Sequence, residues 1–197
     1  SLEQYVRTLS FDQIAERMRQ EKGFSMQETP LEPVTTSDQT VFTYENGTEV
    51  PDTKGAYLTF TLHFMAGKDM LVHLTSADSS AGAGDGTEIS SDNAALPEAM
   101  RISFSTDGQT WVYDPGMGDI RNQEGHAEVF GLPGKDALEL SATNQLFSLK
   151  VGEDKAVLIH IWMEGTDPAC TDELKEADYS IRLRFSGEVT EERIKST

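Results

Sequence analysis

The residues KAVLIHIWMEGTDPACT, 155–171, form the stretch of sequence that decides the fold. Val157, Ile159 and Ile161 are β-branched, and the apolar run continues to the following tryptophan. Such a run is typical of a strand buried on both faces. Gly165 and Pro168 then end the strand, because glycine tolerates positive φ and proline has no N–H for a ladder. The sequence therefore predicts a central strand with a rigid exit turn.

Further strands follow from alternating or β-branched segments on either side of this one. The clearest alternation runs through residues 56–66, where every second side chain is apolar. Strands are expected at 41–44, 56–66, 70–75, 100–105, 110–113, 137–140, 147–151, 156–163 and 179–186. Long loops are expected at 76–98 and 114–136, which are rich in glycine or proline. These about nine strands predict a mainly β protein, an antiparallel β-sandwich of the jelly-roll or Ig-like type.

The N-terminus is predicted to be a short helical segment. Leu2, Tyr5 and Leu9 recur at helical spacing, and Ser10-Phe-Asp-Gln13 reads as a capping box. We expect two short helices, or one that bends near Ser10, ending before Gly23 as the C-cap glycine. Burial of this apolar stripe against the sandwich is favoured over a role as a partner-docking arm.

Three regions follow from these patterns. Residues 1–39 form the N-terminal helical segment and an extended linker that contains two prolines. Residues 40–187 form the β-sandwich domain, and residues 188–197 form a charged tail.

The composition limits the classes of partner. Among 197 residues, 34 are acidic and 16 are basic, a formal net charge of −18. This charge repels nucleic acid phosphates and anionic membrane surfaces, so we expect no nucleic acid partner. No apolar run approaches the ~20 residues of a membrane span, so no membrane insertion is expected. The single cysteine, Cys170, excludes an intramolecular disulfide.

Catalytic motifs are missing from the sequence. It contains neither His-Glu-x-x-His nor Gly-x-Ser-x-Gly, and it has no cysteine cluster. A pair of glycosidase carboxylates stays open, because their separation cannot be read from a sequence. The pattern favours a protein that is not an enzyme.

Two sets of residues are candidates for binding. Glu164, Asp167 and Asp172 surround the exit turn and could hold Ca²⁺, the one cofactor we consider. The alternative, which we favour, is that these carboxylates cap backbone N–H groups. A second set, Trp111, Tyr113 and Trp162, could offer stacking faces to a glycan or another ligand.

Several of these segments resemble a known family. The run Ile-Trp-Met-Glu-Gly-Thr-Asp-Pro-Ala-Cys, 161–170, resembles an Ile-Trp-x-Glu-Gly-x-Asp-Pro-x-Cys signature of secreted surface proteins of Gram-positive gut bacteria. Those proteins are distantly similar to the TasA/camelysin group. The segments 99–104, 111–115 and 179–185 fit the same series, so the resemblance covers roughly residues 57–185.

The resemblance implies a secreted, non-enzymatic protein of the cell surface or the biofilm matrix. It places the chain outside the cell, with a signal peptide that is absent from this sequence and presumed removed. It implies self-association, or association with other surface proteins, through strand donation between subunits. Residues 34–44 would be the natural donor.

Two alternatives stay open. The first is a carbohydrate- or ligand-binding surface module. The weaker one is a camelysin-like metal-dependent peptidase.

Overall fold

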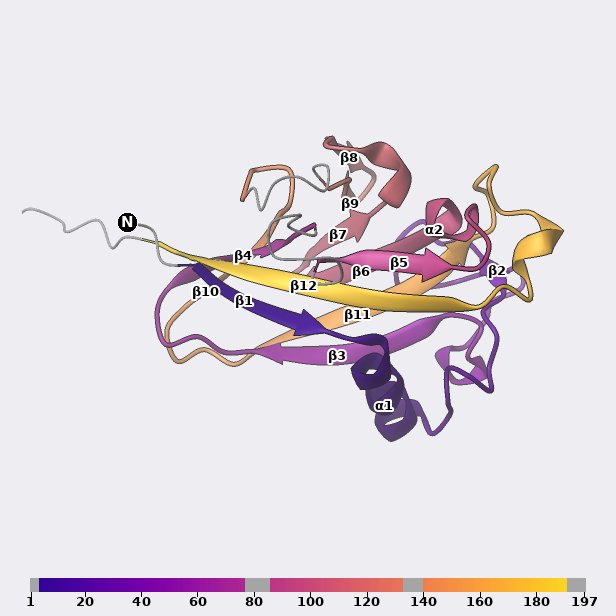
Figure 1. Ribbon diagram of the computed structural model, residues 1–197, viewed down its shortest axis with the longest axis horizontal. Coiled ribbons are helices and arrows are strands. Elements are labelled where there is room, and N and C mark those ends of the chain that lie inside the picture. Colours follow the sequence, from indigo (N-terminus) through magenta and orange to yellow (C-terminus); the bar gives the residue numbers. More distant parts are fainter. Residues whose placement is uncertain (1–3, 77–85, 133–139, 191–197) are drawn as a thin grey trace, which may run out of the picture.

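The computed structural model describes residues 4–76, 86–132 and 140–190 and is mainly β (Figure 1). Within these ranges, twelve strands form two sheets. The prediction of a mainly β chain is confirmed.

The first sheet is antiparallel throughout. Its path is β1 (Gln4–Leu9), β12 (Tyr179–Val189), β4 (Met70–Leu74) and β10 (Gln145–Leu149), and β5 (Glu88–Ser91) also pairs with β12.

The second sheet is mixed, because β2 pairs with β11, and β7 with β9, in parallel. Its path is β2 (Pro33–Val34), β11 (Lys155–Glu164), β6 (Met100–Thr106), β7 (Gln109–Tyr113), β9 (Ala127–Phe130) and β8 (Arg121–Glu124), and β3 (Leu58–Phe64) also pairs with β11. The helical elements are α1 (Phe11–Lys22), α2 (Leu96–Ala99), η1 (Asp52–Lys54), η2 (Pro115–Met117) and η3 (Asp172–Leu174).

Strand β11 is buried on both faces over its second half. Its odd-numbered residues from Val157 to Met163 lie in the larger hydrophobic core, which draws side chains from both sheets. On the opposite face, Trp162 lies in a second core with Phe42 and Tyr57. The predicted central strand is therefore confirmed, and the segment before β3 supplies its outer cover.

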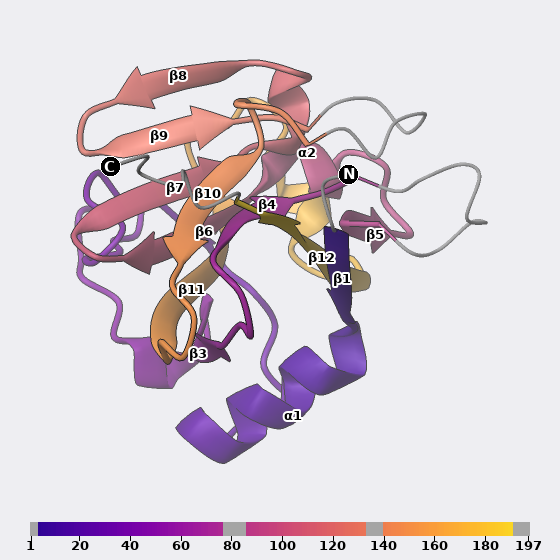
Figure 2. The ribbon, with the colours of Figure 1, turned by 90° about the vertical axis from the view of Figure 1, so that its left-hand side faces the viewer.

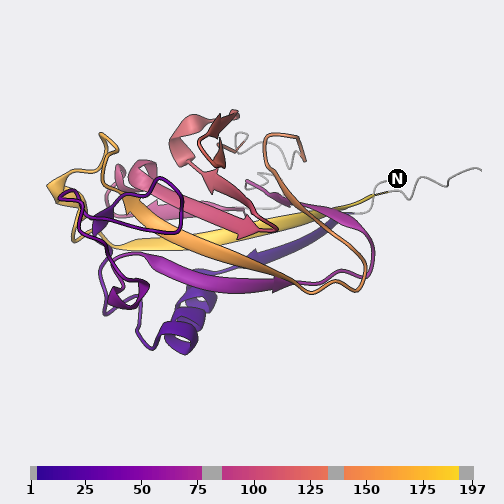
Figure 3. The same ribbon diagram turned by 180° about the vertical axis from the view of Figure 1, so that it is seen from behind.

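Aromatic rings join the two sheets across the larger core. Phe185 of β12 meets Phe64 of β3 and Phe104 of β6 edge to face, at centroid distances of 5.1 and 5.9 Å. Figures 2 and 3 show β12 and β11 as long strands from different sheets that cross one another. Each such pair adds about 0.5–1.5 kcal/mol beyond area burial.

The N-terminal residues 4–9 form strand β1, so the prediction of a helix there was wrong. They pair with β12 in register from Gln4 opposite Glu188 to Leu9 opposite Leu183. Among residues 5–9, Tyr5 and Val6 are exposed and Leu9 is the one buried residue. Pairing with a long neighbouring strand thus outweighs the helical spacing of these apolar residues and favours the extended conformation.

The predicted helix after Ser10 is confirmed as α1. The Ser10 N–H donates to Gln13 Oε1 over 2.9 Å, which completes half of the capping box. Gly23 ends the helix in the left-handed region at φ 77°. Ile14 and Met18 are fully buried in the larger core, as the favoured interpretation of the apolar stripe requires.

The β6–β7 hairpin is also confirmed. Asp107 and Gly108 both take positive φ, 53° and 73°, as a two-residue type I′ turn requires.

Predictions for the loops were less accurate. The loop expected at 114–136 contains the hairpin β8–β9, and the loop expected at 76–98 contains β5 and α2. The strand expected at 41–44 is reduced to single bridges of Thr43. The strand expected at 137–140 and most of the predicted tail fall outside the described residues. None of the described helices is long and apolar enough to cross a membrane.

His160 provides a test of the second core. Its ring is 6% exposed and packs edge to face against Phe42 at 5.1 Å. Burial lowers its pKa to about 4, so the unfolded chain binds a proton more readily than the folded chain between pH 6.5 and 4.

Because the folded-state pKa is lowered, stability from neutral His160 is present above pH 6.5 and falls with decreasing pH. We expect a loss of about 3 kcal/mol between pH 7 and pH 4 from this group alone. Urea unfolding of wild type and His160→Phe at both pH values measures it. The variant should lose less stability than wild type, and an equal loss would contradict the assignment.

Candidate functional site

Three of the four segments that carry the resemblance, 99–104, 111–115 and 161–170, meet at one polar pocket. Arg101 begins β6, Asp114 follows β7, and Trp162 and Glu164 end β11. Side chains from all three segments line a cavity of about 490 Å³. Two further walls come from residues 35–39 and from the β8–β9 hairpin. The pairing of β6 with β7 and β11 brings these three segments together.

Arg101 is the electrostatic centre of this pocket. Its Nη2 lies 2.5 Å from Asp167 Oδ2 and 3.4 Å from Asp114 Oδ2. Its Nη1 donates to the carbonyl oxygens of Glu98 and Met100, at 2.8 and 2.9 Å. One guanidinium thus fixes the exit turn of β11 to the beginning of β6.

Asp167 is held as a carboxylate. Partial burial acts to raise its pKa, but hydrogen bonds from Arg101 and from the Ala169 N–H outweigh burial and lower the pKa. Glu164 accepts hydrogen bonds from Trp162 Nε1 at 2.9 Å and from the Thr166 N–H at 3.2 Å. Both carboxylates therefore cap the turn, as the favoured interpretation predicted.

The three carboxylates predicted as calcium ligands are engaged separately. Asp172 lies apart on the exposed surface, where it pairs with Lys175 at 2.7 Å. Within residues 4–76, 86–132 and 140–190, no three His, Cys, Asp or Glu side chains form a group that could hold a metal ion. Gly165 does not take positive φ either. Its N–H donates to the Val34 carbonyl, which ties the turn to β2.

The three aromatic residues predicted as stacking faces are buried. Trp111, Tyr113 and Trp162 are 4%, 8% and 2% exposed. Trp111 and Tyr113 belong to the larger core and Trp162 to the second core, so the three rings do not form one common binding face. Packing has used their ring faces, and this observation counts against stacking on a glycan.

Gln39 is a pocket residue that sequence reasoning missed. Its backbone lies in the left-handed region at φ 59°, which is uncommon outside glycine. Its side chain is 9% exposed and lines the pocket, yet Oε1 has no hydrogen-bond partner. No residue pattern signals this combination, since it depends on the turn that Asp38 forms by accepting the Thr40 and Val41 N–H groups.

Comparisons with protein families, with curated proteins and with solved structures found no match for this chain. The resemblance drawn from the signature residues therefore stays a prediction.

Two of the predicted calcium ligands provide a matched test. Asp167→Asn should lower the free energy of unfolding by about 2 kcal/mol at pH 7, because it leaves a largely buried Arg101 short of its partner. Asp172→Asn should leave stability unchanged, since its ion pair is exposed. Urea unfolding with and without added Ca²⁺ measures both. Equal losses would contradict the capping role, and a Ca²⁺-dependent gain that both variants abolish would support the calcium site instead.

Proposed function

We propose that this chain is a secreted, non-enzymatic protein of the cell surface or biofilm matrix, built as a β-sandwich that assembles by strand donation. The signature residues support the family, and the aromatic core shared by the two sheets supports the sandwich. The absence of the His-Glu-x-x-His and Gly-x-Ser-x-Gly motifs from the sequence supports the non-enzymatic role.

The observation that carries this proposal is the position of β1. It lies at the edge of the first sheet and, within the described residues, pairs with β12 alone. Its exposed Tyr5 and Val6 make it a strand that contributes little to the core. An edge strand held mainly by backbone hydrogen bonds can be replaced by the same strand of another copy.

Residues 34–44, the donor expected from the sequence, are poorly suited to that role. Val34 and Phe42 are 1% and 0% exposed. Phe42 stacks on Tyr57 at 4.0 Å and meets Trp162 edge to face at 5.3 Å. Withdrawal of this segment would open the second core, so β1 takes its place in the proposal.

The edge strand of the second sheet that faces β1 across an apolar groove, β3, is blocked by α1. α1 lies along β3, where Arg17 Nη1 donates to the Thr61 carbonyl at 3.2 Å. Glu21 accepts the Thr61 N–H at 3.0 Å. Both backbone groups of Thr61 are thereby occupied, which protects this edge against strand addition.

A peptide-rescue experiment tests strand donation. Deletion of residues 1–9 should abolish concentration-dependent oligomers and leave β12 able to bind a peptide of residues 1–10 added in trans. The control peptide carries Pro at both positions 5 and 6, which removes a ladder hydrogen bond whichever residue faces β12. Light scattering and fluorescence anisotropy measure the two effects. A protein that stays monomeric at high concentration, and whose deletion variant ignores both peptides, would refute the proposal.

A second candidate function is binding of a small polyhydroxylated ligand in the polar pocket. Gln39 favours it, because a buried acceptor without a partner and a strained backbone together mark sites kept for function. Thr35, Thr36 and Thr166 line the same cavity. A sugar or polyol could donate to Gln39 Oε1 and fill the remaining polar positions.

Gln39→Gly separates this role from a structural one. Glycine relieves the positive φ and removes the unpaired oxygen, so we expect stability to rise by about 0.5–1 kcal/mol. Binding of neutral sugars, followed by isothermal calorimetry, should fall at the same time. Thr48→Ala, at an exposed turn residue that does not line this pocket, serves as the control. Lower stability with unchanged binding would make Gln39 a packing residue.

A further inference from the structure

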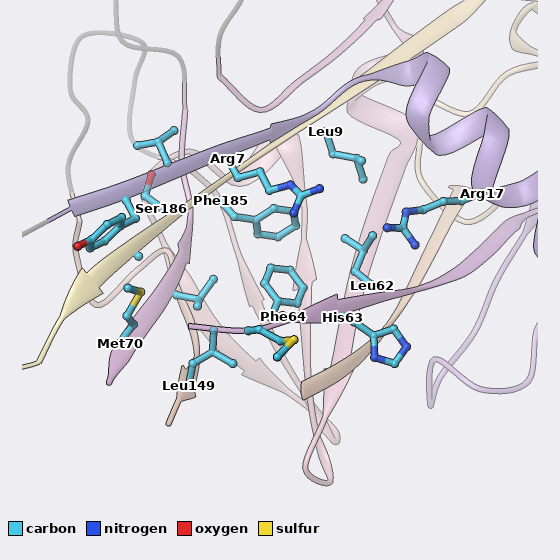
Figure 4. A pocket seen from close by; sticks show the side chains of 15 residues that line it. Arg7, Leu9, Arg17, Leu62, His63, Phe64, Met70, Leu149, Phe185 and Ser186 are labelled. Carbon is cyan, nitrogen blue, oxygen red and sulfur yellow. The ribbon is translucent and has the colours of Figure 1, made fainter. Parts of the chain in front are cut away.

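An apolar groove lies between β1 of the first sheet and β3 of the second (Figure 4). It encloses about 180 Å³. Its walls are hydrophobic and come from four strands besides β1, contributed by Leu62, Phe64, Met70, Leu149 and Phe185. The groove is complete within one chain and is separate from the polar pocket.

Two arginines stand at the rim of this groove. Arg7 reaches from β1 and Arg17 reaches from α1, and both line the cavity (Figure 4). Arg17 makes its hydrogen bond to the Thr61 carbonyl, an uncharged acceptor. Within the described part of the chain, no carboxylate lies within ion-pair distance of either guanidinium.

This charge arrangement is unusual for the molecule. The chain carries 34 acidic residues against 16 basic ones, and Arg19, Arg101, Arg121 and Arg182 all pair with carboxylates. Two acidic side chains near the groove already have other partners. Glu21 accepts the Thr61 N–H, and Asp154 pairs with His63 Nδ1 at 2.8 Å. The two rim arginines are therefore a cationic site above an apolar floor.

We propose that this groove binds a small amphiphilic monocarboxylate, with the carboxylate between Arg7 and Arg17 and a short hydrocarbon chain in the cavity. Guanidinium groups are the preferred partners of carboxylates. The cavity corresponds to about six water volumes at ~30 Å³ each, which suits a medium-length alkyl chain. Burial of that chain against leucine, methionine and phenylalanine side chains supplies the remaining affinity.

Charge and size select this ligand over larger partners. A chain with a net charge of −18 is repelled by anionic membranes and by acidic proteins, whereas a single carboxylate meets only the local positive charge. The groove is also too small to seat a helix. The proposal does not depend on strand donation, because Arg7 occupies the same position whether β1 comes from its own chain or from another copy.

Octanoate is the probe for the test. Titration into the full chain at a concentration where it is monomeric should shift methyl NMR signals of Leu62, Met70 and Leu149. Octylamine and octanol carry the same tail, and both should bind at least about tenfold more weakly, because they lack the charge that the arginines recognise.

Arginine variants locate the head group. Arg7→Gln and Arg17→Gln should each weaken octanoate binding about fivefold to tenfold. Arg19→Gln is the matched control, since Arg19 lies on the same helix, is exposed and pairs with Glu16 outside the groove. It should bind octanoate as wild type does. Leu149→Phe, which fills part of the cavity, should weaken octanoate and octanol alike.

Three results would overturn the proposal. The first is no octanoate-dependent shift at millimolar concentration. The second is equal binding of octanoate, octanol and octylamine, and the third is unchanged affinity in both arginine variants. A dimer that forms without octanoate and dissociates in Arg7→Gln would instead assign the groove to a contact between copies.

Discussion

The burial of β11 on both faces is the constraint on which the rest of the structure depends. One face of this strand builds the core between the two sheets, and the other face needs a cover that neither sheet supplies. Residues 34–57 provide that cover through Phe42 and Tyr57, which pack on His160 and Trp162. The first residues of this cover, 34–39, were predicted to be part of a linker, yet Val34 is buried in the second core. The same cover places residues 35–39 beside the exit turn and so forms one wall of the polar pocket.

The exit turn of β11 converts this packing into a defined site. Arg101 links the turn to the beginning of β6, and Glu164 and Asp167 occupy the N–H groups of the turn itself. Glu164 and Asp167, which the sequence suggested as calcium ligands, are thus occupied by hydrogen bonds that hold the turn. Gln39 is the one described residue of the pocket with a buried side-chain polar atom that has no hydrogen-bond partner.

Local patterns predicted the elements whose determinants are local. The capping box at Ser10, the left-handed Gly23 and the Asp107-Gly108 turn were all readable, because each depends on residues within a few positions. Strand β1 was not readable, since its apolar spacing fits a helix and its partner β12 lies about 180 residues away. The hairpin β8–β9 was missed although Gly125 in its turn takes positive φ at 58°. The parallel pairing of β9 with β7 is the part that no local pattern predicts. The polar pocket combines motif residues that could be named with Gln39, whose strain arises only after the chain has folded.

The hydrogen bonds between α1 and Thr61 make two neighbouring sheet edges unequal. The edge strands β1 and β3 border the apolar groove. Helix α1 covers part of the backbone of β3 but not that of β1. An extended chain that approaches these two edges therefore finds the backbone of β1 accessible and that of β3 occupied at Thr61. The short helix thus protects the β3 edge against the edge-to-edge strand pairing from which amyloid fibrils arise.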